Sequence, residues 1–415
     1  MKHVIYTLTV LFYSFLPGQE ILKFQVESGN YNRMDCPVAL TSLPDGVLNA
    51  IDNLQLVEIT NNGIKPMVSQ INKNSGELGF ILKGFTPKNA TREFQLVTKK
   101  IDTQVSQINL LLKDGAIQLS YKKRPILNYR YETVYPPKGV DSLFKKSGFI
   151  HPLWTPEGEV LTRIQPPDHY HHYGIWGPWT KTKIDNRQVD FWNLGEGQGT
   201  VLFKKFTQKE QGNVYSSFTA LQEHIDFGAK NENRNAINEN LEIRAWNLGD
   251  NKPWLVDYTS EITSPLENGI LFEAYRYGGG IGFRATEIWN KDNTSVLTSE
   301  NKDRITADGS SARWSIIEGA TNTKTGNGGI LFMSHKENKH FPEPMRVWPM
   351  DANGGRGDMF FEFCPIRHKP WQIESDKAYK LKYRMLIFDG SLSAEQAEMA
   401  WQGFANPPKV IIKNN

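Results

Sequence analysis

Hydrophobic and polar positions alternate along most of this chain, in short blocks that are separated by turn residues. The alternation is clearest in residues 54–59, 92–97, 116–123 and 379–388, which are rich in β-branched and aromatic side chains. Successive side chains of an extended strand point to opposite faces, so this period of two predicts β-strands. Asn-Gly and Asp-Gly turn signals lie between the blocks without intervening amphipathic helices, and we therefore expect an all-β architecture.

One short helix is predicted near the end of the chain. Ser393 stands three residues before Gln396, which is the spacing of a capping box, and the helical pattern ends before Asn406. We expect residues 391–415 to form this helix and a tail.

Two domains are expected, because the chain is too long for one ordinary hydrophobic core. A polar stretch at residues 98–108 separates two strand-rich blocks and predicts the boundary. Residues 22–100 would form a small β-sandwich, and residues 106–390 would form a much larger one.

The first 18 residues, 1–18, have the pattern of a secretory signal peptide. Lys2 and His3 precede an apolar run over residues 4–16, and Gly18 offers a small residue for cleavage. This run is shorter than the roughly 20 residues that a spanning helix needs. We therefore expect no membrane span, and a periplasmic or secreted location.

The charge balance bears on the choice of partner. The chain has 48 basic and 45 acidic residues, and this net charge of +3 provides no electropositive surface for nucleic acid. Its 11 Trp, 15 Tyr and 22 Phe suit a carbohydrate substrate, because aromatic faces stack on sugars, although the same residues also fill sheet cores. Cys36 and Cys364 could pair in an oxidising compartment, but two distant thiols are no disulfide framework. No obligate protein partner is indicated.

The stretch PPDHYHHYGIWGPW, residues 166–179, concentrates histidine and tryptophan. Its two prolines favour an extended or turn-like backbone just before Asp168 rather than a helix. In an extended segment His169 and His171 would lie on one face and His172 on the other. Three interpretations stay open: proton transfer or hydroxyl binding, a metal site, and structural hydrogen bonding. The spacing is not a strong metal pattern, and we predict neither a metal nor a cofactor.

A second stretch, LFEAYRYGGGIGFRATEIWN, has three consecutive glycines at residues 278–280. Glycines let the backbone approach a ligand or another strand closely. Arg276 and Arg284 flank them, and a guanidinium suits a carboxylate or neighbouring hydroxyls. The alternative is a β-bulge with two surface arginines.

A third stretch, MFFEFCPIRHKPW, places Phe361 and Phe363 on one face of a strand and Glu362 on the other. Apolar neighbours could raise the pKa of this carboxyl, and a carboxylate in a cleft near His368 is a candidate general base. A salt-bridged strand carboxylate is the alternative. Further polar residues stand outside these stretches, and the sequence does not place their contacts: Asp308, Arg313, His335, His340 and Arg346.

These stretches resemble those of the secreted, mainly bacterial family DUF6807, older records of which carry the name methane oxygenase PmoA. The resemblance rests on SGFIHPLWTPEGEVLT, PPDHYHHYGIWGPW, DFWNLGEG, RYGGGIGFRATE, DGSSARW and FFEFCPIRHKPW, which run over most of residues 106–390. The older name carries no weight, because a membrane monooxygenase needs spanning helices.

The order GFIHPLWTPEG, HHYGIWGPW and FFEFCPIRHKPW also resembles, more distantly, the galactose mutarotase-like supersandwich. This resemblance implies a large twisted β-sandwich with a sugar-binding face. His172 aligns with the histidine of the HGFAR motif and Glu362 with the glutamate that acts as base. The second mutarotase histidine falls at Tyr275, Arg276 and Tyr277, and this departure puts simple mutarotation in doubt.

The sequence therefore predicts an exported carbohydrate-active protein that works by acid/base chemistry, either glycoside cleavage or anomeric epimerisation. A non-catalytic glycan-binding protein and a metal-dependent enzyme centred on the DHYHH segment are the alternatives. The predicted catalytic residues are His169, His171, His172 and Glu362. The predicted substrate-binding residues are Asp168, Trp176, Trp179, Trp192, Arg276, Tyr277, Arg284 and His368.

Overall fold

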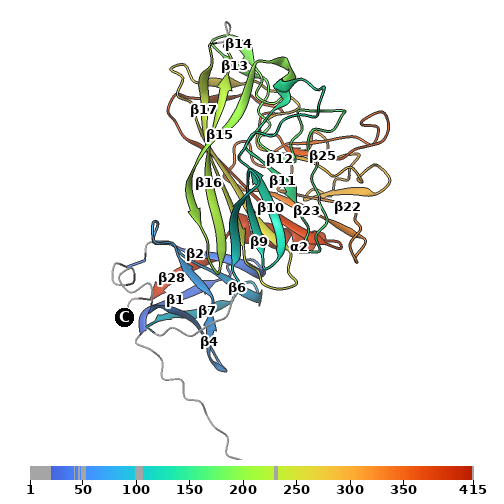
Figure 1. The fold of residues 1–415 in the computed structure, drawn as a ribbon. Coiled ribbons are helices and arrows are strands. Elements are labelled where there is room, and N and C mark those ends of the chain that lie inside the picture. Colours follow the sequence, from blue (N-terminus) through green and yellow to red (C-terminus); the bar gives the residue numbers. More distant parts are fainter. Residues whose placement is uncertain are drawn as a thin grey trace, which may run out of the picture.

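The computed structural model describes residues 20–41, 43–44, 47, 53–98, 106–228 and 232–413. The predicted signal peptide lies outside these residues, as does most of the predicted boundary at residues 98–108. Within them the structure is built from antiparallel sheets with one α-helix near the end, so the all-β prediction is confirmed (Figure 1).

The N-terminal sandwich consists of two small sheets. The first has the order β28 (Lys409–Lys413), β1 (Glu20–Glu27), β7 (Thr91–Val97), β3 (Gln55–Thr60) and β4 (Gly63–Met67). The second has the order β2 (Arg33–Leu40), β6 (Leu78–Thr86) and β5 (Ser69–Ile71). Phe24, Phe80 and Phe94 pack at its centre, with ring centroids 5.2 to 6.1 Å apart.

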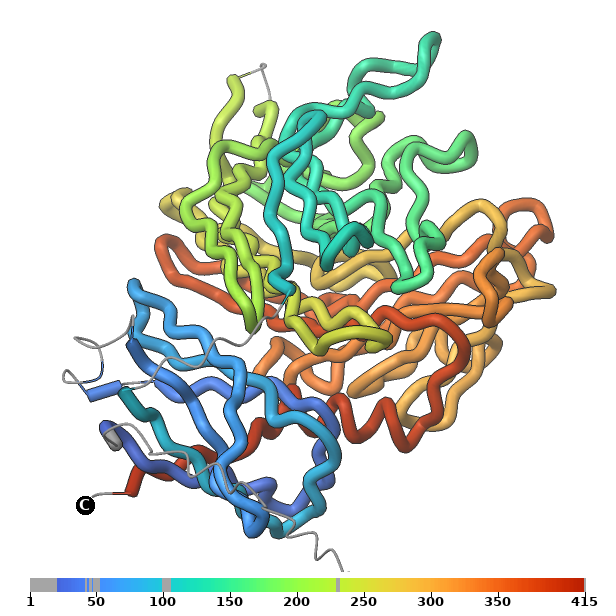
Figure 2. Tube along the Cα trace, turned by 60° about the horizontal axis from the view of Figure 1, so that its bottom comes forward, coloured from blue at the N-terminus to red at the C-terminus, as the bar shows by residue number. Residues whose placement is uncertain are grey.

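The end of the chain differs from the tail that the sequence suggested. Strand β28 pairs with β1, from Lys409 opposite Glu27 to Lys413 opposite Lys23. Figure 2 shows the red C-terminal segment running from the large sandwich to the blue N-terminal one. The last strand therefore completes the first sheet.

Two eight-stranded sheets form the large sandwich. The sheet that carries the candidate site, called the site sheet, has the order β24 (Met345–Val347), β25 (Phe360–Phe363), β20 (Ile281–Arg284), β12 (Ile175–Trp176), β11 (Phe149–Leu153), β10 (Arg124–Arg130), β9 (Ala116–Tyr121) and β8 (Ile108–Lys113). The other sheet has the order β15 (Gly199–Glu210), β16 (Tyr215–Asp226), β17 (Arg234–Trp246), β18 (Trp254–Thr263), β27 (Tyr379–Asp389), β23 (Asn327–Ser334), β22 (Trp314–Ala320) and β21 (Thr294–Thr298). A smaller sheet has the order β14 (Arg187–Val189), β13 (Thr182–Ile184), β19 (Ile270–Phe272) and β26 (Trp371–Ile373).

The period of two in β25 decides which side chains face the core. Phe361 and Phe363 point into the core between the two large sheets, where Phe361 packs on Phe332 with ring centroids 4.9 Å apart. Phe360 and Glu362 point to the other face, as the sequence predicted. The outer face of the site sheet thus carries an aromatic and a carboxyl group side by side.

The one helix, α2 (Ala394–Ala405), begins at the predicted capping box, in which Ser393 and Gln396 bond reciprocally. Its Trp401 stacks on Phe341, with an angle of 2° between the rings. On its other side Gly403 contacts Cys36 of strand β2, so the helix lies between the two sandwiches. Cys36 and Cys364 are both buried free thiols.

Candidate functional site

The backbone of residues 166–172 makes two consecutive turns, so this stretch takes the turn-like form of the two that the prolines allow, and the alternating faces of an extended segment are not found. The amide of His169 donates to the carbonyl of Pro166 at 2.9 Å, and the amide of His172 donates to that of His169 at 3.0 Å. These turns bring all three imidazoles together: the rings of His169 and His172 stack 4.7 Å apart, and His171 lies 4.9 Å from His172. The histidines form one cluster rather than two faces.

Asp168 orients the most accessible of these imidazoles. Nδ1 of His169 donates to Oδ2 of Asp168 at 2.7 Å, and the same oxygen accepts from Nη2 of Arg284 at 2.8 Å. Burial by itself raises the pKa of Asp168, but the hydrogen bond from His169 and the charge of Arg284 together lower it to about 2. The carboxylate is therefore charged at neutral pH and fixes the His169 ring with Nε2 free.

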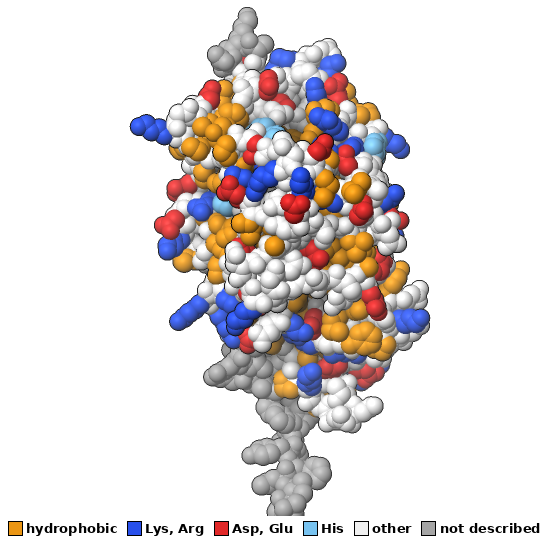
Figure 3. Space-filling view, turned by 90° about the vertical axis from the view of Figure 1, so that its right-hand side faces the viewer, with side chains coloured by type: hydrophobic (Ala, Val, Ile, Leu, Met, Phe, Trp, Pro, Cys, Tyr) orange, Lys and Arg blue, Asp and Glu red, His pale blue; other side chains and the backbone are white. Residues whose placement is uncertain are grey.

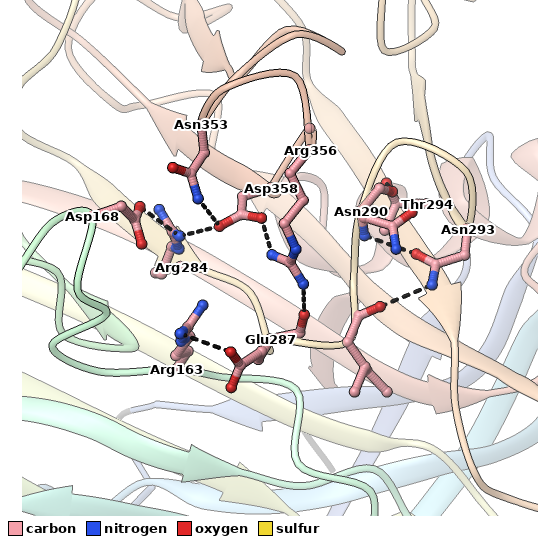
Figure 4. Close-up of polar contacts among 12 residues, drawn as sticks. Arg163, Asp168, Arg284, Glu287, Asn290, Asn293, Thr294, Asn353, Arg356 and Asp358 are labelled. Carbon is pink, nitrogen blue, oxygen red and sulfur yellow. Dashed lines mark hydrogen bonds and ion pairs between the residues drawn. The ribbon is translucent and has the colours of Figure 1, made fainter.

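Arg284 is the centre of a charged network (Figure 4). Its Nη2 also donates to Oδ2 of Asp358 at 2.5 Å, and Asp358 is held in turn by Arg356 and by the amide of Asn353 at 3.0 Å. Only 1% of the Arg284 side chain is exposed. The sequence predicted that Arg284 binds substrate, whereas in the structure its guanidinium binds Asp168 and Asp358.

The proton positions of two imidazoles follow from their partners. Carboxylate oxygen can only accept, so Nδ1 of His169 carries a proton, and in the neutral imidazole Nε2 has the lone pair. A guanidinium can only donate, so Nδ1 of His172, 3.4 Å from Nη1 of Arg284, is the acceptor and its Nε2 carries the proton. Burial, followed by the charges of neighbouring histidines, lowers the pKa of His171 to about 4 and that of His172 well below its ordinary value. His171 and His172 are therefore neutral at physiological pH.

The same protonation argues against a three-histidine metal site. By distance alone the cluster could hold a cation, since one nitrogen from each ring lies within 4.8 Å of the others. A metal at Nε2 of His172 would need the lone pair that the protonated nitrogen lacks, and a metal at Nδ1 would displace Arg284. Two histidines remain, fewer than the three protein ligands usual at catalytic zinc.

Aromatic rings hold the cluster in place. His172 packs against both Trp192 and Phe360, at 5.6 and 5.1 Å, and these two rings lie 5.8 Å from each other. Trp348 packs 4.8 Å from His169. Trp176 of strand β12 lies 5.6 Å from His172. Two of the three predicted tryptophans, Trp176 and Trp192, thus belong to the cluster.

Trp179 lies elsewhere, in the core of the large sandwich, where its ring is 4.3 Å from Phe272. The three glycines allow this packing: a Cβ on Gly279 would come within 2.0 Å of the Trp179 ring, and one on Gly280 within 2.3 Å of the Phe363 carbonyl. The glycines therefore serve a close approach within the protein, and Trp179 is turned away from the histidines.

Glu362 lies fully buried on the site face, opposite Arg346 in the neighbouring strand β24. Its Oε1 accepts from the amide of Gly278 at 2.6 Å, and its Oε2 has no hydrogen-bond partner. Burial raises its pKa well above the ordinary range, beyond what the Gly278 amide and the charge of Arg346 offset. The raised pKa favours the protonated carboxyl, which suits a proton donor better than the base that the sequence predicted.

Tyr277 contacts Arg346, which lies opposite Glu362, and Trp192, which packs on His172. Its hydroxyl accepts from Nη2 of Arg346 at 3.0 Å, and its ring lies 5.3 Å from Trp192. Buried polar atoms without a partner gather around it, namely Nε1 of Trp192, Nε of Arg346 and Oε2 of Glu362. Such atoms are uncommon in native interiors and are usually satisfied by water or a ligand.

The remaining predicted residues lie at the rim. Arg276 is exposed, with its guanidinium 5.3 Å from the centroid of the Tyr277 ring. His368 is exposed too, and its Nε2 contacts the carbonyl of Gly309 at 2.9 Å. Basic and acidic side chains are interspersed over this side of the molecule (Figure 3).

Sequence reasoning missed Trp348 and Asp358, and left Asp308 and Arg346 without contacts. Asp308 binds Arg346 at 2.9 Å and Arg367 at 3.1 Å, and so links its own loop to strand β24 and to the segment after β25. The sequence offered two weak signals for these residues: Trp348 stands next to Pro349, and Asp358 follows a glycine-rich turn. Only the tertiary structure shows that both reach the histidine cluster.

Fold and site together define an all-β protein of two sandwiches, with a histidine, aspartate and aromatic cluster on the outer face of the site sheet. The chain belongs to DUF6807, a family of unknown function, whose model matches residues 116–402. No curated protein matches it in sequence.

Several solved structures resemble it at very low identity. They include the heparan sulfate lyase HepC from Pedobacter heparinus (9% identity, TM-score 0.34, 71% of this chain and 38% of that one) and an alpha-mannosidase from Enterococcus faecalis V583 (8%, 0.46, 95% and 46%). A galactose mutarotase related enzyme from Lactobacillus acidophilus matches as well (8%, 0.33, 69% and 100%). The chain spans less than half the length of the lyase and the mannosidase.

Among the described residues, no helix has the length and apolar character needed to cross a membrane.

Proposed function

We propose that this protein is an exported carbohydrate-active enzyme in which His169, oriented by Asp168, transfers a proton to or from a sugar. The single observation that carries the proposal is the Asp168–His169 pair. Its hydrogen bond is 2.7 Å long, and 35% of the His169 side chain is exposed against 13% of Asp168. A carboxylate behind an accessible imidazole is the arrangement by which enzymes orient a general base.

The two stacked imidazoles also suit a hydroxyl group. Nε2 of His169 is an acceptor and Nε2 of His172 is a donor, and a sugar hydroxyl can donate to the first and accept from the second. Imidazole is the side chain that most often transfers protons near neutral pH. The pair would thereby select a hydroxyl and remove its proton.

Glu362 is proposed as the matching proton donor, because burial raises its pKa and so favours the protonated carboxyl. An acid and a base on either side of a sugar serve hydrolysis, elimination and anomeric epimerisation alike. His171 and Trp192 would line the ring-binding surface beside them. Export rests on the sequence pattern of residues 1–18.

The test is an activity screen on defined oligosaccharides with products identified by mass. Hydrolysis adds water, elimination gives an unsaturated product, and epimerisation changes no mass. We expect His169→Asn to lower kcat/KM by about a hundredfold or more, and Asp168→Asn by about tenfold or more. The matched control is Asp185→Asn, because Asp185 forms an exposed pair with Arg234 at 2.8 Å, away from the histidines.

The same variants separate the enzyme from a non-catalytic glycan-binding protein. Turnover that survives His169→Asn would remove His169 from the proposal. Binding without any turnover in the wild type would sink the enzyme hypothesis and leave a binding protein.

A further inference from the structure

A pocket of about 220 Å³ opens beside the end of the β24–β25 pair, and the acid/base chemistry proposed above does not use it. Pro344 at its wall directly precedes β24, and Pro365 follows β25 by two residues. Phe360, which stacks on His172, lies at the other end of β25. Phe360 and Phe363 are three residues apart, which is about 10 Å along a strand at about 3.3 Å per residue, so the pocket and the histidine cluster lie at opposite ends of β25.

Two imidazoles in the pocket are held by the backbone. Nδ1 of His340 donates to the carbonyl of Pro365 at 2.6 Å, and Nε2 of His368 donates to that of Gly309 at 2.9 Å. Each ring therefore keeps its second nitrogen for a ligand. His340 has a φ of 60°, a conformation that is uncommon outside glycine, asparagine and aspartate.

The only charged side chain among the described residues that line the pocket is basic. Lys369 is exposed at its edge, and none of the described residues that line it is acidic. The nearby Asp308 is already bound by Arg346 and Arg367. Phe341 supplies an apolar face of the kind that packs on a sugar ring.

We propose that this pocket is a second subsite, which binds a negatively charged substituent, carboxylate or sulfate, on another sugar of the oligosaccharide that is held at His169. Lys369 would bind the anionic group, while His340 and His368 bond neighbouring hydroxyls and Phe341 contacts the ring. This inference rests on the proposed function and assigns its substrate class, an acidic oligosaccharide.

The test is titration calorimetry of the full chain with galactose and glucose trisaccharides, each in neutral, uronate and sulfated forms. We expect the charged forms to bind at least about tenfold more tightly than the neutral ones, with a preference that shrinks as salt is raised. Lys369→Gln should reduce the preference about two- to fivefold. Lys113→Gln, at an exposed hairpin, is the control and should leave it unchanged.

His340→Asn provides a second variant that keeps the fold, because asparagine tolerates a positive φ. It should weaken every trisaccharide, charged or neutral. Preference for uronates alone would identify a carboxylate, and preference for both charged forms an unspecific anion site. Equal binding of charged and neutral forms would overturn the subsite and leave the proposed function standing, whereas failure of every trisaccharide to bind would overturn both.

Discussion

Removing the charge of Asp168 tests how the site is built, independently of any substrate. Asparagine has nearly the same shape as aspartate and still accepts the Nδ1 proton of His169. It leaves Arg284, however, with Asp358 as its only carboxylate partner among its described contacts. We therefore expect Asp168→Asn to lower the free energy of unfolding while preserving the fold.

The size of the effect follows from the pKa of Asp168, which is lowered to about 2 from an ordinary value of about 3.9. At 1.36 kcal/mol per pKa unit this corresponds to about 2.5 kcal/mol. Because the carboxylate and His169 are partly solvated, we expect about 1 to 2 kcal/mol at pH 7.

The stabilisation by the Asp168 charge should decrease as the pH is lowered. A carboxyl whose pKa is lower in the folded state stabilises the protein above the unfolded pKa, and this contribution disappears as pH falls through the folded value. About half of the pH 7 difference between wild type and Asp168→Asn should remain at pH 3. Urea unfolding at pH 7, 4 and 3 measures it, with Asp185→Asn as the exposed control, for which we expect below about 0.5 kcal/mol.

A difference that stays constant between pH 7 and pH 3 would refute this reasoning, because it would show that the asparagine acts through shape alone. Equal effects of the Asp168 and Asp185 substitutions would refute it as well. In either case the network around Arg284 would not orient His169 by charge.

Three further predictions address the buried parts of the site. As pH rises from 5 to 8, Glu362→Gln should become more stable relative to wild type. The reason is that the folded protein holds the Glu362 proton more tightly than the unfolded chain, so the wild type loses stability over this range. Thermal unfolding measures the trend, and a relative loss of stability of the variant at pH 8 would contradict it. Gly279→Ala should lower the free energy of unfolding by about 3 kcal/mol or more, because its Cβ meets Trp179. Gly326→Ala has nothing within 4 Å of its Cβ and should lower the free energy of unfolding by about 1 kcal/mol. Denaturant unfolding of both variants measures the difference. Elemental analysis of the purified protein should find less than one equivalent of transition metal, and a full equivalent that the histidine cluster retains against dialysis would overturn our protonation of His172.

The strand β25 shows what the sequence could predict. A period of two places Glu362 opposite Phe361 and Phe363 whatever strands lie beside it, because alternation is a property of the single strand. The raised pKa of Glu362 followed from the same pattern. The hydrogen bond from Gly278 and the complete burial of Glu362, which bear on its role as base, did not follow from the pattern.

The histidine stretch shows where prediction from sequence ended. Two prolines argued against a helix, yet the turns that gather the imidazoles depend on hydrogen bonds to the carbonyls of Pro166 and His169. Trp179 and Trp192 are both aromatic residues near the histidines in sequence, and only packing decides that one enters the core. The partner of Arg284, Asp358, lies 74 residues away along the chain.

In the candidate site the proposed base, His169, is oriented by Asp168, and the proposed acid, Glu362, is buried. Asp358, Arg284 and Asp168 form an unbroken chain of charge contacts that ends at His169, so the accessible imidazole is fixed by groups that themselves cannot turn. Arg304 holds the loop that carries Asp358, through bonds to the carbonyls of Gly357 and Asp358 at 2.6 and 2.9 Å. Glu362, by contrast, is fully buried and accepts a hydrogen bond from the amide of Gly278. In the proposed enzyme the sugar would therefore meet the partly exposed His169 before it meets the buried acid.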